Sequence, residues 1–160
     1  MKKTLQSVPE LTVIAHDVRS ILNVGAIFRT ADAAGAGFVW LTGYTPGPDT
    51  HPEKIEKTAL GAQASVPWGR MRRVGDVVRK LRRQGVSIVA LEQTESSVDY
   101  RKFRPKFPLA IIVGNEVRGI DMSHNVADRY IEIPMRGKKE SLNVAIALGI
   151  ALYGLTRRWK

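Results

Sequence analysis

Two polar side chains in an otherwise apolar stretch, Asn23 and Arg29, are the first candidates for chemistry in this sequence. They are six positions apart (29 minus 23), which is not the three- or four-residue spacing that places side chains on one helix face. An arginine on an apolar helix needs an anionic partner, and its planar fork fits a phosphate. The stretch predicts either a phosphate contact at Arg29 or a salt-bridged or solvated arginine.

The loop at 114–120, GNEVRGI, is a second candidate because it directly follows the apolar run at 109–113. Ligands bind outside the carboxyl ends of the strands in parallel α/β sheets. Gly114 and Gly119 allow the backbone to approach a ligand closely, and Glu116 supplies a carboxylate. The pattern predicts a ligand-binding loop, although a plain connecting turn has a similar composition.

The third candidate is the run IPMRGKKESLNVA at 133–145, in which a basic loop leads into the start of a helix. Backbone N–H groups at a helix start have no partners within the helix and suit an anion or a polar ligand edge. Ser141 and Asn143 lie at this start. Simple helix capping by Ser141 is the alternative, and both interpretations are compatible.

Several common site types are excluded by absent residues. The chain has no cysteine, so disulfides and thiolate metal sites do not occur. Its three histidines, His16, His51 and His124, do not have metal-ligand spacing, and no metal is expected. The dinucleotide fingerprint, the P-loop and the serine nucleophile elbow are also missing. The usual dinucleotide and P-loop folds are therefore not expected.

The charge of the chain indicates a polyanionic partner. Its 160 residues include 25 Lys and Arg against 15 Asp and Glu, which gives a net charge of +10. Such an excess attracts nucleic acid and gains free energy from counterion release, although a merely basic soluble protein is the alternative. The start of the chain does not have the pattern of a signal peptide, and no apolar run is long enough for a membrane span. A cytoplasmic protein is expected.

Apolar periodicity predicts the elements that must position these groups. Continuous apolar runs separated by helical patterns indicate a parallel sheet covered on both faces. The expected strands are 11–15, 38–41, 86–91, 109–113 and 130–133. The first expected helix has Ser20 as its cap and ends before Gly35, and Asn23 is expected in the turn before its first helical turn. The other expected helices cover about 52–59, 71–84 and 141–158. No linker interrupts the pattern, so 1–160 is expected to be a single α/β domain.

Two of these helices have unusual faces. The helix predicted at Met71–Gln84 pairs one apolar stripe with a strongly basic face that includes Arg79, Arg82 and Arg83. This face predicts contact with a nucleic-acid backbone, with a solvated face as the alternative. The last helix is apolar on most sides, which indicates deep burial or a subunit interface.

Taken together, the three segments resemble the SpoU/TrmH family of RNA 2′-O-ribose methyltransferases, within the SPOUT superfamily. The resemblance covers about 11–155 and depends on three motifs in order, NVGAIFRTADAAG, IIVGNEVRGI and IPMRGKKESLNVAIALGIALY, with KTALGAQASVPW after the first. Each motif is weak alone, and together they are highly specific. No appended RNA-binding domain is expected, so the basic face of the domain itself would bind RNA.

The resemblance implies a parallel-sheet α/β fold with a deep C-terminal trefoil knot, which periodicity cannot predict. It implies a homodimer with residues of both subunits at each active site, in agreement with the apolar last helix. It also implies that S-adenosyl-L-methionine binds in a bent shape to the two knotted segments. The expected cofactor-binding residues are Leu91, Gly114, Ile133, Met135, Ser141 and Leu142.

The resemblance also implies the catalytic residues of the chain, which are Asn23, Arg29, Glu116, Ser141 and Asn143. The implied reaction is an in-line attack of a ribose 2′-oxygen on the sulfonium methyl. Family proposals make the arginine the base, but a guanidinium stays protonated, with a pKa above about 12. We therefore expect Arg29 to clamp the target phosphate and stabilise charge on the 2′-oxygen. Substrate phosphate, Glu116 or water would accept the proton.

An RNA substrate is implied as well, with transfer RNA expected and ribosomal RNA as the alternative. The expected RNA-binding residues are Arg29, Arg79, Arg82, Arg83, Arg118 and Arg136. Two further alternatives are a non-catalytic RNA-binding protein of this fold and an enzyme that methylates a base. Saturable binding of the methyl donor would exclude the non-catalytic protein. The Asn23 and Arg29 pair argues against the base-methylating enzyme.

Overall fold

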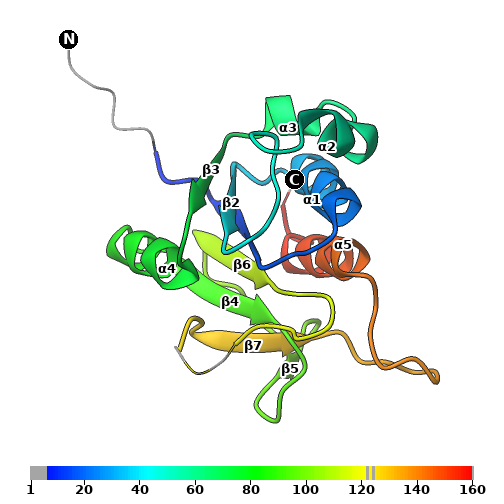
Figure 1. Ribbon diagram of the computed structural model, residues 1–160. Coiled ribbons are helices and arrows are strands. Elements are labelled where there is room, and N and C mark those ends of the chain that lie inside the picture. Colours follow the sequence, from blue (N-terminus) through cyan, green and yellow to red (C-terminus); the bar gives the residue numbers. More distant parts are fainter. Residues whose placement is uncertain (1–6, 122, 124, 160) are drawn as a thin grey trace.

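A parallel sheet between two unequal layers of helices forms the part of the chain that the computed structural model describes, residues 7–121, 123 and 125–159 (Figure 1). The seven strands follow the order β3-β2-β1-β6-β4-β7-β5, and each neighbouring pair is parallel. The strands are β1 (Leu11–His16), β2 (Phe38–Thr42), β3 (Trp68–Met71), β4 (Ser87–Leu91), β5 (Val98–Asp99), β6 (Leu109–Val113) and β7 (Arg129–Glu132).

The helices divide unevenly between the two faces of this sheet. One face is covered by α1 (Ile21–Ala33), α2 (Pro52–Ala59), α3 (Ala62–Ser65) and α5 (Val144–Leu155). The other face is covered by α4 (Val74–Arg83). The predicted α/β architecture with helices on both faces is therefore confirmed.

Strand β6 shows why the middle of the sheet is so apolar. Leu109, Ile111 and Val113 pack toward α1 and α5, whereas Ala110 and Ile112 pack toward α4. All five residues are at most 1% exposed. A strand that serves two cores needs apolar residues at every position, so it lacks the alternation of a half-exposed strand.

The structure differs from the expected elements at the edges of the fold. The basic helix begins at Val74 and not at Met71, because Trp68–Met71 forms the edge strand β3. The last helix ends at Leu155 and not near 158. The four-residue α3 and the two-residue β5 were not predicted. Short or partly exposed elements carry too few buried residues for periodicity to mark them.

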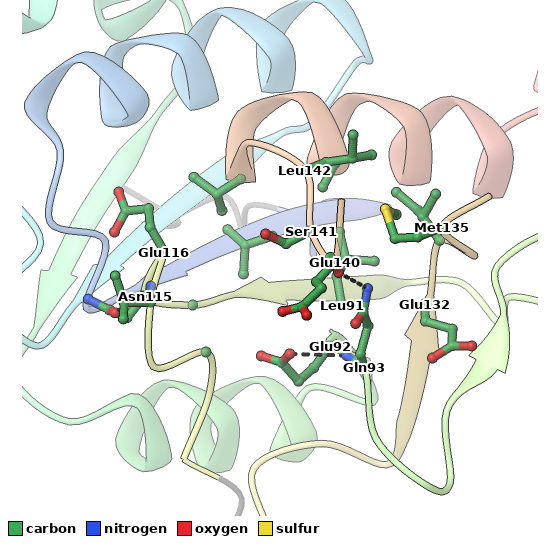
Figure 2. A pocket seen from close by; sticks show the side chains of 17 residues that line it. Leu91, Glu92, Gln93, Asn115, Glu116, Glu132, Met135, Glu140, Ser141 and Leu142 are labelled. Atoms are coloured by element: carbon green, nitrogen blue, oxygen red, sulfur yellow. Dashed lines mark hydrogen bonds between the residues drawn. The ribbon is translucent and has the colours of Figure 1, made fainter. Parts of the chain in front are cut away.

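The order of the last strands places β4 between β6 and β7. The chain that leaves β6 therefore passes β4 and returns on its far side. The segments that follow these three strands lie near the start of α5 (Figure 2). The trefoil knot itself stays a prediction. None of the helices in the described part of the chain is both long and apolar enough to cross a membrane.

Candidate active site

A cavity of about 340 Å³ lies beyond the carboxyl ends of β4, β6 and β7, beside the start of α5 (Figure 2). This is the position at which parallel α/β sheets bind ligands. All six residues expected to hold a cofactor line it, namely Leu91, Gly114, Ile133, Met135, Ser141 and Leu142. The structure thus brings together residues from four separate segments of the chain.

The cavity wall is acidic even though the whole chain is basic. Four glutamates are among its lining residues, Glu92, Glu116, Glu132 and Glu140, and no lysine or arginine is among the described lining residues. Carboxylates repel a phosphate and attract a cation, and they accept hydrogen bonds from hydroxyl and amino groups. The cavity therefore suits a cationic ligand that carries hydroxyl or amino groups.

The loop after β6 is a tight turn whose glycines have no room for a side chain. Asn115 and Gly119 pair across the turn, and Asn115 Oδ1 accepts hydrogen bonds from the N–H groups of Val117 and Arg118 at 2.9 and 2.7 Å. A Cβ atom on Gly114 would lie 2.8 Å from the carbonyl carbon of Gly119, which itself has a φ of +67°. The cavity wall is therefore backbone at these positions.

Residues after β4 hold two other walls of the cavity in place. The Glu92 carboxylate accepts hydrogen bonds from the N–H groups of Gln93 and Ile120, both at 3.0 Å. Gln93 Nε2 donates to the Glu140 carbonyl at 2.9 Å (Figure 2). Sequence reasoning missed Glu92, Gln93, Glu132 and Glu140 as lining residues. Their place at or just after strand ends, or before the last helix, was the signal that pointed to them.

A chain of side-chain hydrogen bonds joins three of the expected catalytic residues. Asn23 Nδ2 donates to Glu116 Oε1 at 2.9 Å, and Asn143 Nδ2 donates to Asn23 Oδ1 at 2.9 Å. Glu116 also accepts from the N–H groups of Arg19 and Ser20 at 3.0 and 3.1 Å. The network ties the start of α1 and the start of α5 to the loop after β6.

The Glu116 carboxylate is stabilised in its charged form. Burial is the largest single influence and favours the neutral acid, but the hydrogen bonds that the carboxylate accepts, led by those from the Arg19 N–H and the Asn23 amide, together outweigh it. The pKa of Glu116 is therefore lower than its ordinary value. A carboxylate with a lowered pKa and three bound donors is a weak proton acceptor, and this one holds the Asn23 amide by a hydrogen bond.

Two local expectations for this network are corrected. Asn23 is the third residue of α1 and does not precede its first turn. Asn143, and not Ser141, caps α5, because its Oδ1 accepts from the N–H groups of Ala145 and Ile146 at 2.9 and 3.3 Å. The expected cap at Ser20 is confirmed by a 3.3 Å bond from the Asn23 N–H to its hydroxyl. Ser141 is left exposed at the cavity.

Comparison with known proteins agrees with this geometry. The SpoU rRNA Methylase family matches residues 10–153. The chain belongs to this family. A tRNA (guanosine(18)-2′-O)-methyltransferase of Escherichia coli K12 is 35% identical over 151 residues, which are 94% of this chain and 64% of the relative. The corresponding enzyme of Aquifex aeolicus is 34% identical over 153 residues, 93% of this chain and 70% of the relative.

Solved structures show the same fold. The AdoMet-bound rRNA methyltransferase from Sinorhizobium meliloti has a TM-score of 0.86 and 35% identity, over 94% of this chain and 57% of that chain. This SpoU-family chain thus spans just under two thirds of the Escherichia coli relative and just over half of the Sinorhizobium protein. The match covers the cavity and the three motifs.

Arg29 of this SpoU-family chain does not line the cavity. It is exposed on α1. Six residues along a helix correspond to a rotation of about 240° from Asn23. Arg29 therefore shares a face with Leu22, Ala26 and Ala33, and the structure does not bring it to the Glu116 network.

The expected RNA-binding arginines of this SpoU-family chain lie in two places. Arg118 and Arg136 are exposed in the loops beside the cavity. On α4, Arg79, Arg82 and Arg83 are all exposed, and Asp76 and Asp128 offset the charges of Arg79 and Arg82 by ion pairs. The basic face of α4 is therefore less positive than its sequence indicates. Their RNA-binding role stays a prediction.

Metal-site geometry is not found among the described residues, where no group of three or more His, Cys, Asp or Glu is placed to hold an ion. His16 instead contacts the Thr42 hydroxyl at 2.9 Å and Asp17 at 3.4 Å. His124 lies outside the described residues.

Proposed function

We propose that this chain transfers a methyl group from S-adenosyl-L-methionine to a ribose 2′-hydroxyl of RNA. The observation that carries the proposal is the acidic, backbone-walled cavity at the end of β4, β6 and β7 in a chain of the SpoU family. The relatives described above act, by name, on tRNA or rRNA. Transfer RNA is the proposed substrate, and ribosomal RNA is the second candidate.

The residues of the cavity fit the methyl donor. Bound S-adenosyl-L-methionine supplies an activated methyl group on a sulfonium centre. Its positive charge matches the carboxylates of the wall, and its ribose hydroxyls and amino groups find acceptors there. A phosphate-bearing dinucleotide would meet the same carboxylates without a cation to balance it. The acidic wall thus supports the donor and separates its site from the RNA backbone.

The residues of the chain position the reactants and hold charge. Glu116 fixes Asn23, and Asn23 in turn fixes Asn143, so the two amides present a preorganised polar surface beside the cavity. Glu116 itself is committed to its donors, which leaves the substrate phosphate or water to accept the proton of the 2′-hydroxyl. Arg29 is the proposed clamp on the target phosphate.

We also propose that the chain is a homodimer, because α1 and α5 share an exposed apolar surface. Leu22 on α1 is 56% exposed, and Ile146 and Tyr153 on α5 are each 58% exposed. Tyr153 donates a hydrogen bond to the Ala33 carbonyl at 3.0 Å, which joins the two helices. A two-fold contact on this surface would carry Arg29 toward the cavity of the second protomer.

Replacing Ile146 with lysine is expected to convert the dimer into a monomer and to abolish methyl transfer. A buried, unpaired ammonium at the centre of an apolar contact costs several kcal/mol, more than such an interface tolerates. Sedimentation equilibrium measures the change. The matched control is Val98→Lys on β5, where a 40% exposed valine lies away from this surface. A monomeric wild type, or a dimeric Ile146→Lys, would contradict the proposed interface.

The activity is tested with methyl-tritiated donor on bulk transfer and ribosomal RNA, followed by nuclease digestion and mass spectrometry of the labelled nucleoside. A 2′-O-methylated ribose is expected. Gly114→Ala should abolish donor binding in calorimetry, because its Cβ would press on the backbone of Gly119. Gly137→Ala, where a Cβ meets no atom within 4 Å, should bind normally. Absence of saturable binding by the wild type would favour a non-catalytic RNA-binding protein, and a label on a base would exclude ribose chemistry.

A further inference from the structure

A second cavity, of about 280 Å³, lies at the opposite end of α5 from the acidic cavity. A helix of twelve residues is about 18 Å long, so the two cavities are separated by about that distance along α5. We call this second cavity the C-terminal groove. Its walls combine three aromatic and three guanidinium side chains, those of Phe103, Phe107, Trp159, Arg104, Arg157 and Arg158.

One wall of the C-terminal groove is an alternating segment, RKFRPKF at 101–107. Phe103 and Phe107 are half-buried and pack against the main core, whereas Arg104 and Lys106 are exposed. The Phe107 ring in turn contacts the Trp159 ring, with 5.1 Å between the ring centroids and 50° between their planes. The alternation anchors the aromatic side chains and leaves the basic ones facing solvent.

Trp159 presents a large aromatic surface to solvent at this groove. Its side chain is 40% exposed, and its backbone N–H donates to the Thr156 carbonyl at 2.7 Å, which fixes the turn after α5. A tryptophan that packs against a neighbouring aromatic ring and still exposes part of its own ring to solvent provides a surface on which a nucleobase stacks. The other two tryptophans, Trp40 and Trp68, are each half-buried in the sheet.

The charge of the C-terminal groove is opposite to that of the acidic cavity. None of its described lining residues is acidic, and neither Arg104 nor Arg158 has an ion-pair partner among the described residues. Arg157 is held by a 3.2 Å bond from its Nη1 to the Arg101 carbonyl and keeps its charge. Unpaired guanidinium groups beside exposed aromatic rings match the phosphates and bases of a single strand.

We propose that the C-terminal groove binds a single-stranded segment of RNA, with a base on Trp159 and phosphates on Arg104 and Arg158. The proposal rests on the proposed function to the extent that RNA is the substrate. The bound segment lies about 18 Å from the acidic cavity along α5, so it is remote from the nucleotide that is methylated. The groove would raise RNA affinity without taking part in the chemistry.

The test measures binding of a fluorescently labelled 12-nucleotide oligouridylate by polarisation, at about 50 and 200 mM salt. Arg104→Glu with Arg158→Glu should weaken binding at least about ten-fold and reduce the salt slope by about 1.4, which is two lost contacts on a single strand. Trp159→Ala should weaken binding about five-fold or more, and Trp159→Phe should retain most of the affinity. Lys54→Glu with Lys57→Glu on α2 is the control, because it makes the same change in net charge.

Two results would overturn the proposal. One is wild-type affinity in the arginine and tryptophan variants, and the other is an equal loss in the lysine control, which would show a response to net charge alone. Methyl-donor calorimetry on the same samples separates this proposal from the proposed function. RNA binding that depends on the groove, without binding of the methyl donor, would contradict the proposed methyl transfer and support the groove as an RNA site. If the groove variants bind the donor, transfer methyl groups and keep full RNA affinity, the proposed function is supported and the groove proposal is wrong.

Discussion

Replacing Arg29 with alanine is expected to lower the rate of methyl transfer by about 100- to 1,000-fold, the usual effect of removing one donor from a developing oxyanion. Binding of the methyl donor should stay within about two-fold of the wild type, because Arg29 does not line the cavity of its protomer. Single-turnover transfer to RNA and calorimetry measure the two quantities. Arg29→Lys keeps the charge but removes the planar fork. If Arg29→Lys has near-normal turnover, the bidentate clamp is wrong.

Mixed dimers decide whether Arg29 acts across the subunit interface. Co-expressed Arg29→Ala and Gly114→Ala chains are each expected to be inactive alone. Half of the dimers that form at random are mixed, and each of these has one cavity with an intact loop and an Arg29 from the other chain. The mixture should therefore recover about a quarter of the wild-type activity. Background activity in the mixture would place Arg29 and the cavity it serves in the same protomer.

Glu116→Gln is expected to lower both stability and transfer. An amide has one acceptor oxygen in place of two, so its NH₂ group would face either the Arg19 N–H or the Ser20 N–H and the Asn23 amide, which bind different oxygens of Glu116. The loss is about 1–2 kcal/mol, which in a chain of this length lowers the Tm by about 2–8 °C. Transfer should fall about ten-fold or more, because a neutral amide holds Asn23 less tightly than the carboxylate does. Glu95→Gln, an exposed loop carboxylate, is the control.

The stability difference between the wild type and Glu116→Gln should depend on pH. The pKa of Glu116 is lower in the folded chain than its ordinary value of about 4.3. Its contribution is therefore complete above that ordinary value and is lost as the pH falls through the lower folded value. Thermal melts should show the largest difference near pH 7 and a shrinking one below about pH 4. An equal difference across this range would mean that the charge of Glu116 is not what stabilises the network.

The central part of the fold followed from the sequence because its strands are buried on both faces. The apolar run at 109–113 predicted a strand between two layers, and Leu109–Val113 has that place. Edge elements were harder to predict. Residues Trp68–Met71 are all half-buried, so no contrast between apolar and polar positions marks them as a strand. The helix predicted from the basic pattern therefore began at Met71, three residues before the actual start of α4 at Val74.

The resemblance named residues that lie together in the structure, but it did not show how they are arranged. Motif resemblance named Asn23, Glu116 and Asn143, and the structure joins them by hydrogen bonds. Local pattern did not show that Asn143 caps α5, because Ser141 is an equally good cap by residue type. The acidic wall was also missed, since charge was counted over the whole chain. A cavity that gathers carboxylates from distant segments is visible only after the chain folds.

The position of β6 has a consequence for how the chain is made. Strand β6 pairs with β1 on one side and with β4 on the other. Because β6 is synthesised after both of these strands, each has an unpaired edge until β6 emerges. A nascent chain that ends before Leu109 exposes open edges on β1 and β4, and such edges pair with other molecules. Stalled or truncated products of this length should therefore aggregate, and ribosome-bound chaperones would be needed during that interval of synthesis.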